Sequence, residues 1–86
     1  MKMPYLVYDD TELTALIDIL NELQEAESRY PQWPTDPIHA VAIMAEESGE
    51  AVQAANNLVW HGGDREALRE ELVQTAAMAI RCLKNL

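Results

Sequence analysis

Residues 36–64 read DPIHAVAIMAEESGEAVQAANNLVWHGGD, and this segment carries the signals that begin and end one long helix. Asp36 is a favourable N-cap residue, and the proline after it suits the first position of a helix. The two glycines near the end of the segment stop that helix, and Asp64 caps the next one. The segment therefore predicts one helix over about residues 37–60 and another over about residues 65–86.

The residues before this segment predict a further helix and an N-terminal arm. Residues 9–11, DDT, supply N-cap chemistry, and a helix is expected to run from there to about Arg29. Its apolar side chains recur at helical spacing, and they are Leu13, Leu16, Ile17, Leu20 and Leu23. Prolines stop this helix in residues 30–37. Residues 1–10 are expected to form a short extended arm, and no strand-like pattern follows. We therefore predict one all-α domain over residues 1–86.

Size, charge and cysteine content limit the class of protein. The chain has 86 residues, a net charge of −9 and a single cysteine, Cys82. This length makes one domain, and the acidity excludes the basic surface with which proteins bind a nucleic-acid polymer. One cysteine and an N-terminus without signal-peptide character predict a cytoplasmic protein. No apolar run approaches the ~20 residues that span a bilayer, so no membrane partner is expected.

The two later helices are apolar on more than one side. One apolar stripe of the last helix contains Leu68, Leu72, Ala76, Ala79 and Leu83, and a second contains Val73, Ala77 and Ile80. A helix that is apolar around most of its circumference is buried over most of it. Three helices cannot bury all of these side chains among themselves. We therefore expect a homodimer or homotetramer in which oligomerisation completes a four-helix-bundle core.

Two short acidic motifs lie on these consecutive helices. They are Glu46-Glu47-Ser48-Gly49-Glu50 and Glu70-Glu71-Leu72-Val73-Gln74. Side chains three residues apart project from one helical face, roughly 5–6 Å apart at Cβ, so Glu47 pairs with Glu50 and Glu71 with Gln74. Clustered carboxylates favour a hard divalent cation such as Mg²⁺, which prefers oxygen ligands. The alternative is that these are ordinary surface acids of amphipathic helices.

The expected hairpin of the two helices predicts how the motifs meet. If the chain turns about its two adjacent glycines, Glu50 lies level with about residue 75 and therefore beside Gln74. Glu47 and Glu71 are then offset by one or two turns along the helix axes. A single ion would be reached from both helices only by stretched side chains.

The motifs and their flanks resemble the all-α NTP pyrophosphatase superfamily, in particular its MazG-like branch. That family's signature is Glu-x-x-Glu on one helix and Glu-x-x-Asp on the next. Residues 39–51, HAVAIMAEESGEA, are similar to the family's helix with a Glu-Glu-x-Gly-Glu core. Residues 70–77, EELVQTAA, are similar to the third-helix motif of small phage-type members. The likeness covers roughly residues 25–86, and Gln74 stands where the signature has aspartate.

The resemblance implies a Mg²⁺-dependent enzyme that hydrolyses a nucleoside triphosphate to the monophosphate and pyrophosphate, with Mn²⁺ as a substitute metal. It implies that Glu47, Glu50 and Glu71 are catalytic and bind the metal, with Gln74 as a fourth ligand. A glutamine offers a carbonyl oxygen but no charge. The alternative is therefore a non-catalytic oligomerisation or nucleotide-binding module that has lost activity through Gln74. A carboxylate-bridged iron or manganese bundle is disfavoured, because neither histidine has a partner at metal-ligand spacing.

Four further residues are candidates for binding the substrate. Arg81 shares a stripe with Gln74 and could contact a phosphate, or it could only interact with the dipole at the end of its helix. Lys84 is a second candidate for a phosphate contact. Trp33, in the proline-rich segment, could stack on a base or pack on the core. Asn57 could form a hydrogen bond with a base or sugar edge.

Overall fold

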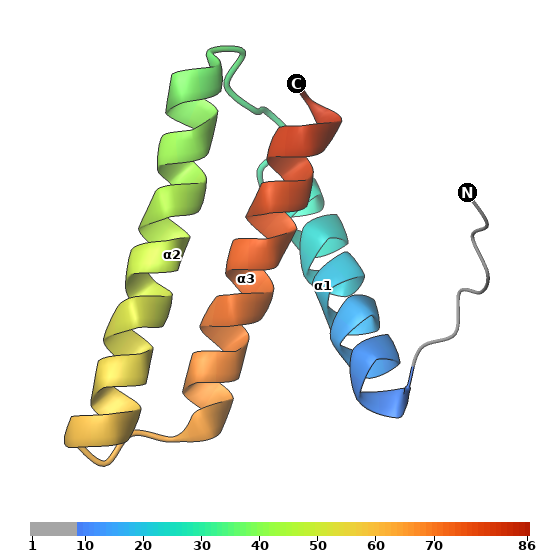
Figure 1. The fold of residues 1–86 in the computed structure, drawn as a ribbon. Coiled ribbons are helices and arrows are strands. Elements are labelled where there is room, and N and C mark those ends of the chain that lie inside the picture. Colours follow the sequence, from blue (N-terminus) through green and yellow to red (C-terminus); the bar gives the residue numbers. More distant parts are fainter. Residues whose placement is uncertain (1–8) are drawn as a thin grey trace, which may run out of the picture.

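A computed structural model of the protein describes residues 9–86, which form three α-helices (Figure 1). These are α1 (Asp10–Arg29), α2 (Pro37–Trp60) and α3 (Arg65–Lys84). The predicted all-α class and the three predicted helices are confirmed. The predicted arm falls mostly on residues 1–8, which lie outside the described residues. Its last residue, Asp10, already belongs to α1.

Each helix begins at an aspartate whose side chain accepts a hydrogen bond from the first turn. Asp9 forms a capping box with Glu12, whose backbone N–H lies 2.7 Å from the Asp9 carboxylate. Asp36 accepts from the N–H of Ile38 at 3.0 Å, and Asp64 accepts from the N–H of Ala67 at 2.7 Å. These bonds satisfy backbone donors that have no partner within the helix, and they fix where each helix starts.

The connection between α2 and α3 depends on two glycines that do different things. Gly62 has a φ of 70°, a left-handed conformation that is unfavourable for a residue that carries a side chain. Gly63 folds back onto the end of α2, where its N–H donates to the carbonyl of Asn57 at 2.8 Å. A Cβ on Gly63 would lie only 3.0 Å from the backbone carbon of Asn57. The turn is therefore tight, and α3 starts close beside the last turns of α2.

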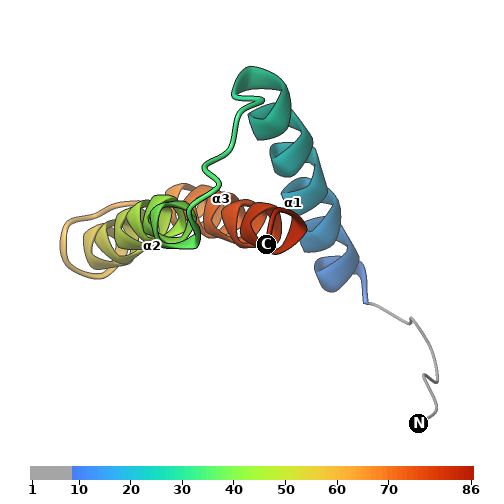
Figure 2. The ribbon, with the colours of Figure 1, turned by 90° about the horizontal axis from the view of Figure 1, so that it is seen from above.

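The third helix lies in the middle of the molecule. Viewed from above, α2 flanks α3 on one side and α1 crosses it at an angle on the other (Figure 2). Both α1 and α2 pack against α3, whereas no Cα atom of α1 lies within 8 Å of a Cα atom of α2. The segment between α1 and α2 therefore spans the width of the molecule at one end (Figure 1).

A small core lies where the three helices come closest. Its buried members are Leu23, Ala26, Ala77 and Met78, and the partly buried side chains packed against them are Ile19, Trp33, Ile43, Met44 and Ile80. Ala77, in the middle of α3, is 0% exposed. The second predicted stripe of the last helix is thus the one that enters the core. No large side chain among residues 9–86 is fully buried, so this core is thin.

Many large apolar side chains remain exposed in the single chain. The predicted apolar stripe of α1 is one example, because Ile17 is 49% and Leu20 is 51% exposed, and of its members only Leu23 is buried. Trp60, at the end of α2, is 74% exposed. Helix α1 instead turns Leu23 and Ala26 toward α3. None of the three helices is long and apolar enough to cross a membrane.

Candidate metal centre

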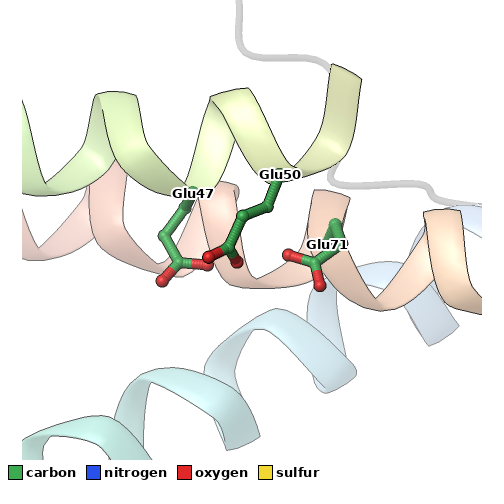
Figure 3. Close-up of side chains that lie close together, drawn as sticks. All are labelled: Glu47, Glu50 and Glu71. Atoms are coloured by element: carbon green, nitrogen blue, oxygen red, sulfur yellow. The ribbon is translucent and has the colours of Figure 1, made fainter. Parts of the chain in front are cut away.

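Three glutamates from the two acidic motifs converge between α2 and α3. Glu47 and Glu50 project from α2, Glu71 projects from α3, and their carboxyl groups turn toward one another (Figure 3). One carboxylate oxygen from each residue lies within 4.8 Å of the others. Among residues 9–86, these are the only three acidic, histidine or cysteine side chains found grouped in this way. We call this group the glutamate cluster.

The glutamate cluster is partly shielded from water. Glu47 and Glu71 are half-buried, while Glu50 is exposed. The Oε2 atoms of Glu47 and Glu71 are buried and have no hydrogen-bond partner among residues 9–86. Burial, followed by the nearby Glu50 carboxylate, raises the pKa of Glu47 above its ordinary value of 4.5. Burial and the hydrogen bond and charge of Glu50 raise the pKa of Glu71 in the same way. Three carboxylates so placed repel one another.

No ion pair joins the glutamate cluster to a cation among residues 9–86. Ion pairs hold Arg29, Arg69 and Lys84 to other acids, none of which belongs to the glutamate cluster. Buried carboxylate oxygens without partners are costly, and a divalent cation with oxygen ligands satisfies them. The donor set of the cluster fits such an ion, since it offers three carboxylates and neither thiolate nor imidazole.

The structure pairs the residues of the two motifs differently along the helix axes from the pairing that the sequence predicted. We expected Glu50 beside Gln74, with Glu47 and Glu71 offset along the helix axes. Instead Glu50 and Glu71 line one groove, and Glu47 and Gln74 line a separate cavity. The physical reason is the tight turn. Because the chain folds back along the end of α2, α3 is shifted along α2 by about one helical turn from its place in a simple hairpin. Gln74 therefore lies next to the cluster, on the side of Glu47.

That cavity has a volume of about 500 Å³ and opens between α1, the segment before α2, and the facing sides of α2 and α3. Its polar and aromatic lining includes Glu22, Trp33, Glu47, Gln74 and Arg81. We call it the central cavity. Its size falls in the range of small-ligand pockets, roughly 300–1,000 Å³. The cavity borders the glutamate cluster through Glu47, so a molecule bound in it would lie next to the carboxylates.

Arg81 and Trp33 meet in the wall of the central cavity. Arg81 is 3% exposed and donates to the backbone carbonyls of Ala26, Tyr30 and Gln32. Its guanidinium carbon lies 4.6 Å from the centre of the Trp33 ring. The chain thus already engages Arg81, which lies near the C-terminal end of α1, where helix carbonyls carry partial negative charge. Its contact with a phosphate stays a prediction.

The other two predicted substrate contacts lie in different places. Asn57 lines the shallow groove together with Glu50 and Glu71, so it is on the open side of the glutamate cluster. Lys84 is at the far end of α3 and forms a 2.7 Å ion pair with Glu27 of α1. The structure therefore brings Asn57 close to the cluster but gives Lys84 an acidic partner elsewhere.

Sequence reasoning did not identify Glu22 of α1. It lines the central cavity with Glu47 and Gln74, and its charge is one of the causes that raise the pKa of Glu47. Glu22 does not belong to the apolar stripe predicted for α1, so the sequence pattern gave no reason to place it at a site. The available signal was its spacing, since Glu22 is one residue from Leu23 and four from Ala26, the two residues of α1 that are buried.

No family model, curated protein or solved structure matches this chain.

Proposed function

We propose that this protein is a Mg²⁺-dependent nucleoside triphosphate pyrophosphohydrolase, which converts a (d)NTP and water into the (d)NMP and pyrophosphate. One observation carries the proposal. Three glutamates from two helices place their oxygens within 4.8 Å of one another, and two of these residues have buried oxygens without a partner. The likeness of the two motifs to the MazG-like branch supports the same reaction.

The residues of the site divide the chemistry between them. Glu47, Glu50 and Glu71 would hold the Mg²⁺, and Gln74, which lines the central cavity together with Glu47, would add its amide oxygen. When bound, Mg²⁺ neutralises charge on the triphosphate and stabilises the charge that develops as the bond between the α- and β-phosphates breaks. A cluster carboxylate that accepts a hydrogen bond from the attacking water orients it and takes its proton.

The central cavity supports binding of the rest of the nucleotide. It is large enough for a nucleoside, it borders the cluster at Glu47, and it is lined by an aromatic ring at Trp33. A base can stack on an aromatic ring irrespective of its identity, because every base has a π-face. Asn57 lies on the other side of the cluster, where it can form a hydrogen bond with a phosphate or the sugar.

We infer that the active form is a homodimer or homotetramer with a four-helix-bundle core. The thin core of one chain supports this inference, as do the exposed apolar side chains of α1 and α2. A chain of this size has difficulty burying enough surface alone, and a second copy is the simplest way to cover two apolar faces.

The test is pyrophosphate release from a panel of common NTPs and dNTPs, measured with Mg²⁺, with Mn²⁺ and with EDTA. Turnover with either metal and its loss with EDTA are expected. Glu71→Gln should lower turnover by about two orders of magnitude or more, because it removes one of the metal ligands. Glu46→Gln is the matched control, since Glu46 is exposed and outside the cluster. Nucleotide binding without turnover would support the non-catalytic alternative.

A further inference from the structure

Arg81 is a buried cation that the proposed chemistry does not use. It is 3% exposed, and it makes no ion pair with an acid among residues 9–86. Its hydrogen bonds go instead to the backbone carbonyls of Ala26, Tyr30 and Gln32. Because an arginine presents its donors in one rigid plane, a guanidinium that binds three carbonyls has a fixed orientation. Arg81 is therefore a rigid part of the wall of the central cavity.

The segment that carries Trp33 has few hydrogen bonds of its own. Residues 31–35 form neither helix nor strand, and none of them takes part in a backbone–backbone hydrogen bond within the described chain. Two of the five are prolines, which have no N–H to donate. Within the same part of the chain, their one hydrogen bond is that from Arg81 to the carbonyl of Gln32. The position of this segment therefore depends on Arg81 and on the packing of its own side chains.

Close packing does not enclose the ring of Trp33. This side chain is half-buried and packs against the small core, but it also borders two hollows. One is the central cavity, and the other is a hollow of about 100 Å³ whose lining includes Pro37, Cys82 and Leu86. A ring with empty space on two sides has room to move, so a specific contact is needed to hold it. The guanidinium of Arg81, 4.6 Å from the ring centre, supplies that contact.

We propose that Arg81 is a positioning residue of the nucleotide site: it holds the ring of Trp33 at the wall of the central cavity and thereby sets the affinity for the nucleobase. The guanidinium covers one face of the ring and leaves the other for a base. A base that stacks on a ring already held in place loses less binding free energy to ordering of the side chain. The effect falls on binding, because neither residue belongs to the glutamate cluster. This inference rests on the proposed function, because it takes Trp33 as the surface on which the base stacks.

The first measurement follows the ring itself and needs no activity. In a Trp60→Phe background Trp33 is the sole tryptophan, since the chain has two. Arg81→Met should shift the emission maximum of Trp33 and weaken binding of AMP, measured by quenching of that emission, by about fivefold or more. Arg69→Met is the matched control, because it removes an α3 cation that pairs with α1 but does not line the central cavity. Circular dichroism checks that every variant is folded at the assay temperature.

Steady-state pyrophosphate release then separates binding from chemistry. With the preferred nucleotide of the panel, Arg81→Met should raise KM by about fivefold or more and change kcat by less than about twofold. Arg81→Lys keeps a charge near the ring but lacks the planar fork, so its KM should be intermediate. In a Trp33→Leu background, Arg81→Met should change KM no further, because Arg81 acts through the ring.

The outcomes distinguish this role from the proposed function. Unchanged emission of Trp33 in Arg81→Met would overturn the positioning role. Equal KM values for Arg81→Met and Arg69→Met, or additive effects of Arg81→Met and Trp33→Leu, would do the same, and the proposed function would stand in each case. A wild type that binds AMP but releases no pyrophosphate would overturn the proposed function alone. A wild type that neither binds AMP nor turns over a nucleotide would overturn both.

Discussion

The guanidinium of Arg81 lies over the ring of Trp33, 4.6 Å from its centre, and joins residues that are far apart in the sequence. The same guanidinium donates to the carbonyls of Ala26 and Gln32, each at 3.5 Å, and to the carbonyl of Tyr30. Arg81 therefore connects the last turn of α1 and the segment after it to α3. The stacking also holds Trp33 at the wall of the central cavity.

Replacing Arg81 should destabilise the fold. Arg81→Met keeps the apolar stem but removes the hydrogen bonds to three carbonyls and the contact of the guanidinium with Trp33, so the free energy of unfolding should fall by about 2–4 kcal/mol. Urea denaturation followed by circular dichroism measures the change. Lys84→Met is the control, since it removes an exposed ion pair that contributes less than about 1 kcal/mol. Equal losses in the two variants would show that the Arg81 contacts contribute little.

Stability of the metal-free protein should depend on pH through Glu47 and Glu71. Both have a pKa above the ordinary value of 4.5, so in the window just above that value the folded chain binds more protons than the unfolded chain. The contribution of these two groups to stability therefore falls as pH rises through the window. Thermal unfolding in EDTA should occur at a higher temperature at about pH 5 than at about pH 7.

The double variant Glu47→Gln, Glu71→Gln is the control for this pH effect. It cannot titrate at the two positions, so its unfolding temperature should change less between the two pH values and should exceed that of the wild type at neutral pH. Saturating Mg²⁺ should stabilise the wild type but not the variant. An identical pH profile for wild type and variant would contradict the assignment of the effect to these two glutamates.

Gln74 is the residue at which the chain departs from the MazG-like signature. Gln74→Asp adds a carboxylate beside Glu47 and should tighten metal binding, although the side chain is one methylene shorter. Gln74→Leu should lower activity without unfolding the protein, because the position borders apolar surface. Calorimetric titration with Mg²⁺ and the pyrophosphate assay measure the two effects. If the wild type is inert and Gln74→Asp hydrolyses nucleotides, the chain is a relative that lost its chemistry here.

The exposed stripe of α1 should hold copies of the chain together. Ile17→Glu introduces a charge into this stripe and should shift the protein toward its 9.7 kDa monomer while the helices persist. Sedimentation velocity at micromolar concentration measures the change. Thr11→Glu, at an exposed position on the opposite face of the same helix, should leave the assembly intact. A wild type that sediments as a stable monomer would refute the expected homo-oligomer.

Local signals in the sequence predicted the helices well because capping is a local effect. Asp36 and Asp64 bond to N–H groups two or three residues away, so their meaning does not depend on the rest of the fold. The sequence also predicted that Glu47, Glu50 and Glu71 contribute to one site, since spacing along each helix determines which side chains share a face.

The remaining features depend on how the helices sit against one another. The level of Glu50 relative to α3 follows from the fold-back of Gly63, which helix periodicity does not describe. Arg81 was expected to contact a phosphate or to interact with the dipole at the end of its own helix, but its guanidinium donates to the carbonyl of Ala26 in α1. Glu22 lies outside the apolar stripe predicted for α1, but four of the five side chains of that stripe are exposed in the single chain, and Glu22 instead lines the central cavity.

The central place of α3 has a consequence for how the sequence can vary. Helices α1 and α2 each meet only one neighbour within the chain, whereas α3 must match two at once. Ala77 has no exposed surface, so even one added methyl group there presses on both sides. In a library of all single substitutions, replacements at Ala77 and at the other core positions of α3 should therefore be rejected more often than replacements at exposed positions of α1 and α2. The middle helix is therefore the part of this protein whose sequence should tolerate the fewest substitutions.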